Sequence, residues 1–242
     1  MNHMMKRALV TGGSGGIGAA ICKRLGAAGH FVYVHANRGQ SAADAVVSEI
    51  VAAGGAAATI AFDVTDAGAT RGALELLVDQ SPIQILVNNA GIHDDAAFPG
   101  MSSQQWHRVI DVTVDGFYNV THPLMLPMIR TRWGRIVNIS SVTALCGNRG
   151  QVNYAAAKGA LNAATKALSL EVASRGVTVN AVAPGIIATA MSGAFDASMI
   201  ASLVPLKRAG TADEVASLVG YLASVEAGYI TGQVISVNGG MI

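Results

Sequence analysis

Tyr154 and Lys158 are the residues of this chain whose types and spacing most directly suggest chemistry. The sequence from Tyr154 to about Ser174 is rich in Ala and contains no Pro, which predicts a helix. On a helix, side chains four residues apart lie on one face, one turn from each other. A phenol has a pKa of about 10, and a nearby ammonium group favours the phenolate. Such a pair can act as a general acid and base near neutral pH.

An ordinary amphipathic helix also explains the pair, with the tyrosine half-buried and the lysine in solvent. Taken alone, this second explanation is the better one, because short motifs match many unrelated sequences. The elements that would have to position Tyr154 and Lys158 therefore decide between the two explanations.

A glycine-rich turn near the amino terminus lies in the sequence context of a dinucleotide site. Residues 7–11 predict a buried strand, and a helix ending at Gly29 is expected after the turn TGGSGGIG. Glycine lets the main chain approach a ligand closely, and the free N–H groups of the helix favour a pyrophosphate. A tight structural turn is the alternative. The residues expected at the dinucleotide here are Gly12, Ser14, Gly15, Gly16, Ile17 and Gly18.

The end of the second expected strand, residues 31–35, carries the sequence His35-Ala36-Asn37-Arg38. In the common dinucleotide fold, an acidic residue at this point binds the ribose hydroxyls. Here that acid is missing, and Asn37 and Arg38 can instead hydrogen-bond a 2′-phosphate. This favours NADPH over NADH. The alternative is that Arg38 is a solvated loop charge.

Polar and small residues also follow the third and fourth expected strands, residues 56–62 and 83–87. Ligands of parallel sheets bind where the strands end, so these residues are candidates for the dinucleotide site. The acid after the third strand can accept from the adenine amino group, or it can cap a helix starting near residue 66. A plain turn would use the same residue types after the fourth strand. The candidates are Asp63, Val64, Asn89, Ala90 and Gly91.

The second half of the chain continues the alternation of helices and strands. Ser102 is expected to cap a helix over residues 103–131, which Pro123 and Pro127 should kink or interrupt. Thr211 is expected to cap the last helix. The remaining strands are expected over residues 135–139, 177–182 and 233–237. This alternation predicts an α/β fold with one doubly wound parallel sheet and helices on both faces.

No linker or repeat divides the chain, so residues 1–242 are expected to form a single dinucleotide-binding and catalytic domain. Within it, residues 186–206 are rich in small residues and Met. We expect this segment to be a mobile lid over the site, because insertions at strand ends commonly gate access.

Composition limits the partners of the chain. Only 13% of its 242 residues are charged, against about 25% in typical proteins, which suggests surfaces covered by other subunits. The net charge of +1 indicates neither nucleic acid nor membrane. Cys22 and Cys146 fit a reducing compartment and lack metal-ligand spacing. Without a signal peptide or membrane helix, we expect a soluble cytoplasmic protein that has no metal site.

Four separated stretches together resemble the short-chain dehydrogenase/reductase family. They are TGGSGGIG, NNAG, Ser141 upstream of Tyr154 and Lys158, and Pro184-Gly185 before Thr189. The stretches NYAAAKGAL, EVASRGVTVNAVAPG and YITGQVISVNGGM are similar to those of bacterial 3-oxoacyl-(acyl-carrier-protein) reductases. The resemblance implies a Rossmann fold of seven parallel strands and usually a homotetramer. It also implies NADPH-dependent reduction of a 3-oxoacyl thioester carried on acyl carrier protein.

The resemblance assigns roles to individual residues. Tyr154 would protonate the substrate oxygen, Ser141 would hydrogen-bond that oxygen, and Lys158 would hold the nicotinamide ribose and lower the pKa of Tyr154. Other cofactor contacts would come from Asn89, Ala90, Gly91, Pro184, Gly185, Ile187 and Thr189. Asp63 and Val64 would flank the adenine.

Two departures and two further arginines bear on these roles. Thr113 occupies a position where the family usually has an Asn that helps hold a relay water, so the proton relay is expected to be slowed or rearranged. Gly15 stands where many NADPH-using relatives carry Arg, which leaves most of the 2′-phosphate discrimination to Arg38. Arg132 and Arg175 match positions that dock the acidic carrier protein.

Two other functions are open from the sequence. One is a dehydrogenase of another small ketone or alcohol, since the fold hosts many substrates. The other is a weakly active dinucleotide-binding subunit that pairs with an active homologue, an alternative motivated by Thr113. Retention of Ser141, Tyr154 and Lys158 argues against this last alternative.

Overall fold

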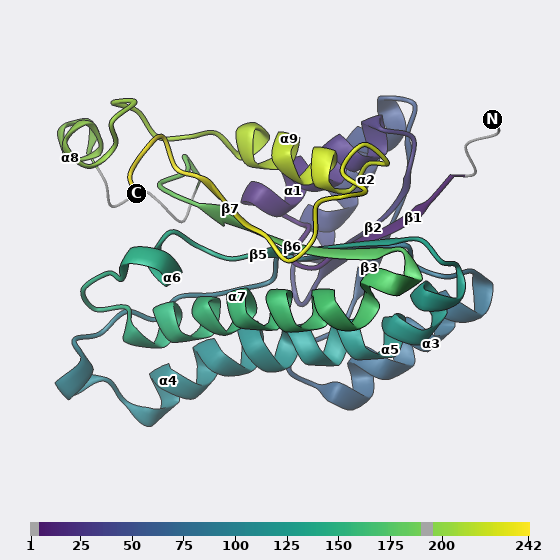
Figure 1. The fold of residues 1–242 in the computed structure, drawn as a ribbon, viewed down its shortest axis with the longest axis horizontal. Coiled ribbons are helices and arrows are strands. Elements are labelled where there is room, and N and C mark those ends of the chain that lie inside the picture. Colours follow the sequence, from purple (N-terminus) through teal and green to yellow (C-terminus); the bar gives the residue numbers. More distant parts are fainter. Residues whose placement is uncertain (1–4, 190–195) are drawn as a thin grey trace.

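A parallel sheet of seven strands runs through the centre of the protein (Figure 1). The computed structural model describes residues 5–189 and 196–242. The strands are β1 (Arg7–Val10), β2 (Phe31–Ala36), β3 (Ala56–Ala61), β4 (Ile85–Asn88), β5 (Gly134–Ile139), β6 (Val177–Pro184) and β7 (Val234–Val237). Their order is β3-β2-β1-β4-β5-β6-β7, so the direction of winding reverses between β1 and β4. This confirms the Rossmann-type, doubly wound fold.

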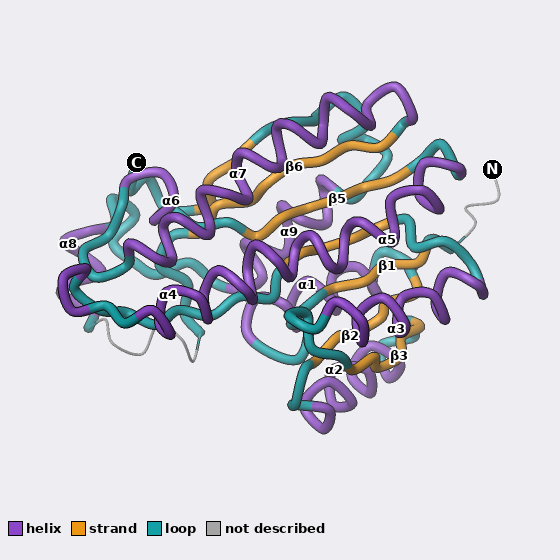
Figure 2. Tube along the Cα trace, turned by 90° about the horizontal axis from the view of Figure 1, so that it is seen from below, coloured by secondary structure: helices purple, strands orange, loops and turns teal. Residues whose placement is uncertain are grey.

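Helices cover both faces of the sheet, as Figures 1 and 2 show from two directions. One face carries α1 (Gly16–Ala27), α2 (Gln40–Ala52) and α9 (Ala212–Leu222), and the other carries α3 (Ala67–Gln80), α5 (Gly116–Arg130) and α7 (Val152–Val172). Strand side chains alternate between the two layers because the strand period is two. In β1, Ala8 and Val10 pack into the first hydrophobic core, whereas Leu9 packs into the second.

The expected long helix over residues 103–131 is interrupted, but not at its prolines. Helix α4 (Ser103–Ile110) begins at the predicted cap, where Ser102 and Gln105 form a reciprocal capping box. A π-helical turn, Asp111–Asp115, then separates α4 from α5. Such turns accommodate one extra residue and are frequent at functional sites.

Pro123 and Pro127 both lie inside α5, so the part of the prediction in which they interrupt the helix is wrong. Each removes one backbone N–H from the helical ladder. However, Leu124 and Met128 of α5 are fully buried against the sheet. Burial of each such side chain contributes roughly 1.5–3 kcal/mol, which offsets the lost hydrogen bonds.

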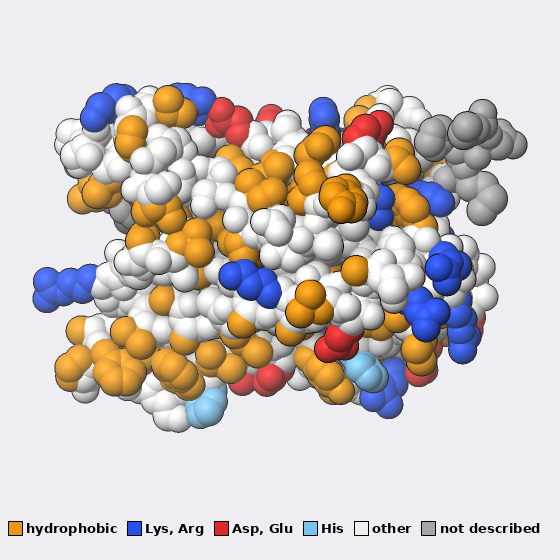
Figure 3. Space-filling view, in the orientation of Figure 1, with side chains coloured by type: hydrophobic (Ala, Val, Ile, Leu, Met, Phe, Trp, Pro, Cys, Tyr) orange, Lys and Arg blue, Asp and Glu red, His pale blue; other side chains and the backbone are white. Residues whose placement is uncertain are grey.

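Short helical segments complete the fold. They are the 3-10 turns η1 (Phe98–Gly100) and η3 (Ala173–Arg175) and the helices α6 (Thr143–Cys146) and α8 (Ala197–Leu203). Residues 190–195 of the expected lid lie outside the described residues, and the described remainder contains α8. None of the helices in the described ranges is long and apolar enough to cross a membrane. Figure 3 shows charged side chains scattered among apolar ones on one face of the molecule.

Candidate active site

A pocket of about 340 Å³ opens where β1, β4, β5 and β6 end. It lies at the reversal of strand order, the point where doubly wound sheets bind their ligands. Fifteen of the residues singled out from the sequence line it, together with Ile139, which the sequence analysis missed, and Ser140, the neighbour that the family spacing set aside in favour of Ser141. The fifteen are Gly12, Gly15, Gly16, Ile17, Gly18, Asn89, Ala90, Gly91, Ser141, Tyr154, Lys158, Pro184, Gly185, Ile187 and Thr189.

The glycine turn after β1 is packed tightly against the turn after β4. Asn89 Nδ2 donates to the carbonyl oxygens of Thr11 at 2.9 Å and Gly12 at 3.0 Å. Gly12 has a φ of +61°, a left-handed conformation that favours glycine. A Cβ on Gly18 would lie 2.1 Å from the Gly12 carbonyl oxygen, so no larger residue fits there without moving the turn.

The start of α1 suits a phosphate group. Gly15 precedes the helix, and among the described residues no side chain caps its first turn, so the backbone N–H groups there can bind a ligand. A Cβ on Gly15 would meet nothing within 4 Å, which leaves open space in front of these N–H groups. Free N–H groups and the positive end of the helix dipole bind anions, so the residues present fit a dinucleotide pyrophosphate.

Asn88 and Asn89 point in different directions, although the sequence suggests two equivalent carboxamides. Asn88 is 6% exposed and donates to Asn138 Oδ1 at 2.9 Å and Thr121 Oγ1 at 3.0 Å. Asn138 in turn donates to Thr165 on α7 at 2.8 Å. Asn88 therefore joins β4 and β5 to the helices beneath them, and Asn89 alone of the two lines the pocket.

Asn153 fixes the start of α7 and thereby the place of Tyr154. Its Nδ2 donates to the carbonyl oxygens of Asp94 at 2.9 Å and Gln105 at 3.1 Å, while its Oδ1 accepts the Tyr154 N–H at 2.8 Å. The side chain of Asn153 is fully buried. The sequence analysis missed this role, although an Asn in the first turn of a helix often bonds to nearby backbone groups.

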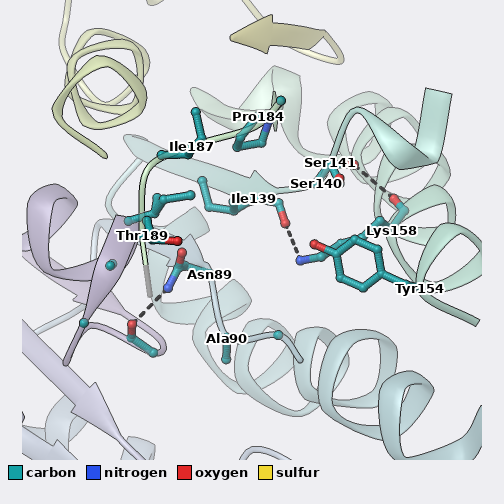
Figure 4. A pocket seen from close by; sticks show the side chains of 17 residues that line it. Asn89, Ala90, Ile139, Ser140, Ser141, Tyr154, Lys158, Pro184, Ile187 and Thr189 are labelled. Carbon is teal, nitrogen blue, oxygen red and sulfur yellow. Dashed lines mark hydrogen bonds between the residues drawn. The ribbon is translucent and has the colours of Figure 1, made fainter. Parts of the chain in front are cut away.

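Lys158 lies one turn after Tyr154 and points its amine toward the end of β5 (Figure 4). Its Nζ donates to the Ile139 carbonyl oxygen at 2.7 Å and lies 5.7 Å from the centroid of the Tyr154 ring. A Cβ at Gly91 would come within 3.0 Å of this amine, so glycine there leaves room for it. Lys158 is only 3% exposed, and burial lowers its pKa to about 8.

The pKa of Tyr154 is raised in this structure, whereas the sequence analysis expected Lys158 to lower it. Burial is the main cause, because it disfavours the phenolate, and the Asp95 carboxylate adds to the effect. A hydrogen bond with the Ser141 side chain opposes both. The expectation is wrong for this arrangement because the Lys158 amine is engaged by the Ile139 carbonyl and is itself desolvated.

Asn37, Arg38 and Asp63 come together beside the pocket without lining it. Thr65 donates to Asp63 Oδ1 through its backbone N–H at 2.9 Å and its hydroxyl at 2.8 Å. These bonds lower the pKa of Asp63, and Asn37 and Arg38 lower it further. The cap of α3 is Asp66, which accepts from the Ala69 N–H, so Asp63 is not the helix cap.

Ser14 and Val64 also lie outside the pocket lining. The nearest atom to a Cβ built on Gly39 is Ser14 Oγ, at 3.9 Å, which places Ser14 beside the turn that carries Asn37 and Arg38. Val64 is 5% exposed, and its carbonyl oxygen accepts from Asn119 Nδ2 at 2.9 Å. Its side chain packs against the start of α5.

Comparison with known proteins places this arrangement in a family. Residues 6–199 match the short chain dehydrogenase family. The chain belongs to the short-chain dehydrogenase family. Membership implies an oxidoreductase that uses a nicotinamide dinucleotide, which agrees with the fit of the glycine turn to a pyrophosphate.

Relatives align with this short-chain dehydrogenase over nearly its whole length. A 3-oxoacyl-(acyl-carrier-protein) reductase of Aggregatibacter actinomycetemcomitans is 43% identical over 241 residues, covering 98% of this chain and 100% of the relative. An acetoacetyl-CoA reductase of Shinella zoogloeoides is 44% identical, covering 98% of each chain. Nodulation protein G of Rhizobium sp. (strain N33) is 42% identical, covering 98% of this chain and 96% of the relative.

Thr113, which the resemblance places where the family usually has an Asn, does not line the pocket. It lies in the π-helical turn and is 2% exposed. Its Oγ1 is buried and has no hydrogen-bond partner among the described residues. A buried hydroxyl without a partner costs about 1–3 kcal/mol unless a water molecule satisfies it.

Arg132 and Arg175 lie at the other end of the sheet from the pocket. Arg132 precedes β5 and Arg175 precedes β6, whereas the pocket lies after these strands. The two residues are close to each other, since Arg132 donates to the Ser174 carbonyl oxygen at 3.5 Å. Strand β6 has eight residues, so its two ends are about 25 Å apart. Within one chain, these arginines do not reach the mouth of the pocket.

Proposed function

We propose that this chain, as a single domain over residues 1–242, uses NADPH to reduce 3-oxoacyl thioesters on acyl carrier protein to 3-hydroxyacyl products. Such a reaction belongs to fatty-acid synthesis or a related polyene or polyketide pathway. The observation that supports the proposal most is the convergence of Ser141, Tyr154 and Lys158 with the glycine turn around one pocket. The names of the relatives supply the substrate class, with carrier-linked and CoA-linked versions both represented.

The side chains divide the work of the reduction. When bound at the glycine turn, NADPH would supply the hydride for the carbonyl carbon. Tyr154 donates its phenolic proton to the oxygen of that carbonyl, and with its pKa above the ordinary value the phenol is protonated at neutral pH. Ser141 Oγ accepts the Thr143 N–H at 3.2 Å, which fixes the hydroxyl that hydrogen-bonds the same oxygen. Lys158 would hold the nicotinamide ribose.

Arg38 is proposed to select NADPH through its 2′-phosphate. Replacing Arg38 by Asp puts a negative charge where the phosphate would lie. The neighbouring residues Asn37 and Gly39 carry no positive charge that could bind the phosphate instead. We expect kcat/KM with NADPH to fall about tenfold or more, while kcat/KM with NADH stays level or rises. Steady-state rates with both coenzymes measure this. An unchanged NADPH-to-NADH ratio would show that Arg38 is only a solvated loop charge.

Thr113 is proposed to hold the relay water less effectively than Asn. Thr113→Asn should raise kcat by roughly two- to tenfold and shift the pH profile of kcat. This increase is small beside the roughly 10²–10⁴-fold that general acid–base catalysis contributes to reaction rates. Thr113→Val is the matched control, because it keeps the shape and removes only the hydroxyl. We expect kcat of this control to fall while its thermal stability holds, since Oγ1 has no protein partner. Identical kcat and pH profiles in all three proteins would exclude a relay role.

We propose that the protein works as a homo-oligomer, a tetramer, in which Arg132 and Arg175 of one subunit lie near the pocket of another. Two observations support this. The arginines are at the far end of their own chain from the pocket. In addition, the outer sides of α5 and α7 expose large apolar side chains, with Leu126 66% and Leu170 83% exposed, as expected of surfaces covered by another subunit.

The carrier-protein proposal predicts a substrate-dependent effect of Arg132→Glu combined with Arg175→Glu. KM for an acetoacetyl-carrier thioester should rise about tenfold, because two attractive contacts with an acidic protein become repulsive. KM for acetoacetyl-CoA should change less than about twofold. Lys23→Glu, on α1 at the opposite face, is the control and should leave both values unchanged. Equal effects on both thioesters would contradict docking at these arginines.

Following NADPH oxidation with several substrates tests the proposed function as a whole. We expect turnover with acetoacetyl thioesters of carrier protein and CoA, with the larger kcat/KM for the carrier-linked form. A simple ketone without a thioester should react at least about tenfold more slowly, because remote contacts contribute to the rate. Preference for the simple ketone would favour a dehydrogenase of another small ketone or alcohol. Absence of turnover with all substrates would favour a non-catalytic subunit.

A further inference from the structure

His35, the penultimate residue of β2, is buried between the glycine turn and the end of β3. It is 2% exposed. The backbone N–H of Gly12 donates to its Nδ1 at 3.1 Å, and its Nε2 lies 2.9 Å from the Phe62 carbonyl oxygen. Since Nδ1 accepts and a carbonyl oxygen can only accept, the proton must be on Nε2. The imidazole is therefore neutral, in a single tautomer.

The main chain of His35 holds the next residue of the same turn. Its carbonyl oxygen accepts the Gly13 N–H at 2.8 Å, so two successive N–H groups of the glycine turn end on His35. These contacts help to hold Gly12 in its left-handed conformation, with a φ of +61°. The Gly12 carbonyl oxygen is held as well, because it accepts a hydrogen bond from Asn89 Nδ2. The ring of His35 packs against the Phe62 ring, with 4.1 Å between centroids.

The other partner of the imidazole leads to the second half of the coenzyme site. Phe62 directly precedes Asp63, the carboxylate that interacts with Asn37 and Arg38. Asn37 is two residues after His35 itself. One side chain thus connects the expected pyrophosphate turn with the residues expected at the adenosine.

We propose that His35 is a positioning residue of the coenzyme site, whose neutral imidazole holds the glycine turn in its binding conformation and releases it on protonation. This rests on the proposed binding of a nicotinamide dinucleotide at that turn. A protonated Nδ1 would carry a hydrogen and face the Gly12 N–H donor to donor. The turn would then have to move, and coenzyme affinity would fall at acid pH.

The surroundings of His35 set the pH at which its imidazole becomes protonated and coenzyme affinity falls. Burial is the largest influence and lowers the pKa of the imidazole, while the Phe62 carbonyl and the Asp63 carboxylate oppose that effect. Among the described residues, Asp63 is the charged group found to act on it. Cys22 of α1 also lies at the turn, 3.8 Å from the Gly13 carbonyl oxygen, but burial raises its thiol pKa and keeps it neutral. The loss of affinity is therefore expected on the acid side of 6.5.

Coenzyme titrations of three proteins test the proposal. The dissociation constants of NADPH and NADH are measured by fluorescence from pH 8 to pH 5 for the wild type, His35→Asn and His35→Leu. Asn can present Oδ1 to the Gly12 N–H and does not titrate, whereas Leu offers no acceptor. The 2′-phosphate of NADPH has a pKa of about 6, but it titrates equally in all three proteins, and NADH lacks it. Thermal unfolding at each pH restricts the comparison to folded protein.

We expect His35→Asn to bind both coenzymes within about threefold of the wild type at pH 8, and folded His35→Leu to bind at least about fivefold more weakly. Between pH 8 and pH 5, the wild type should lose at least about fivefold more NADH affinity than His35→Asn. Equal losses in these two proteins would overturn the proposal, and this comparison decides it even if His35→Leu does not fold. Absence of coenzyme binding by the wild type at pH 8 would instead overturn the proposed coenzyme, and this inference with it.

Discussion

Replacing Tyr154 by Phe is expected to lower kcat for reduction by about 10²–10⁴-fold, the range attributable to a positioned general acid. The phenol is the group that we propose to donate the proton. The Ser141 side chain, which contacts the phenol, is shorter than a tyrosine and is held in place by the Thr143 N–H, so we do not expect it to take over this role. Phe keeps the ring that packs beside Lys158, so the pocket should retain its shape. Steady-state NADPH oxidation with an acetoacetyl thioester measures the effect.

Coenzyme binding provides the control for Tyr154→Phe. The dissociation constant of NADPH should change less than about threefold, because the phenolic oxygen is one of many contacts expected around the dinucleotide. Tyr221→Phe, on the exposed side of α9, should match the wild type in both measurements. Retention of more than a tenth of the wild-type kcat by Tyr154→Phe would show that another group supplies the proton.

Replacing Lys158 by Met is expected to abolish measurable reduction while leaving the protein at least as stable as the wild type near pH 7. Burial lowers the pKa of Lys158 from 10.5 to about 8 in the folded protein. The difference of about 2.5 units corresponds to about 3 kcal/mol of unfavourable free energy when the amine is charged. Met has a similar shape and no charge, although it loses the hydrogen bond to Ile139.

The sign of the pH dependence follows from proton binding. Between about pH 8 and pH 10.5 the unfolded chain binds the Lys158 proton and the folded protein does not, so this residue makes stability rise with pH in that window. Below pH 8 both states are protonated, and the full penalty is present. Urea unfolding of wild type and Lys158→Met at pH 7 and pH 9.5 should show this rise in the wild type alone. Equal slopes in both proteins would contradict a desolvated Lys158.

Local sequence patterns predicted the strands and the pocket well, because both depend on short-range chemistry. The glycine turn follows β1 directly, NNAG begins with the last residue of β4, and Pro184-Gly185 begins with the last residue of β6. In a parallel sheet these ends meet at one edge, which is why fifteen of the candidate residues share one pocket. The capping residues Ser102 and Thr211 were also predictable, since a capping box lies within four residues.

Features that depend on tertiary packing were not predictable. The π-helical turn at Asp111–Asp115 leaves no local signal, whereas Pro123 and Pro127 give a strong one that the core of α5 overrides. The direction of Asn88 follows from its partners on β5 and α5, which are distant in sequence.

Electrostatic effects of burial were likewise not visible in the sequence. Spacing places Lys158 beside Tyr154, but it does not show that the Ile139 carbonyl receives the amine or that desolvation dominates both pKa values. The role of His35 was missed for the same reason. Its two partners, Gly12 and Phe62, lie on different segments and meet only in the folded sheet.

The fate of a deuterium label tests the central claim most directly. The wild-type protein is incubated with an acetoacetyl-carrier thioester and NADPH that carries deuterium at C4 of the nicotinamide, on one face or the other. We expect a 3-hydroxybutyryl product with one deuterium at C3 from one of the two labelled coenzymes and none from the other, as shown by mass spectrometry. A product without deuterium from either coenzyme, or no product at all, would contradict hydride transfer in the pocket beside Tyr154.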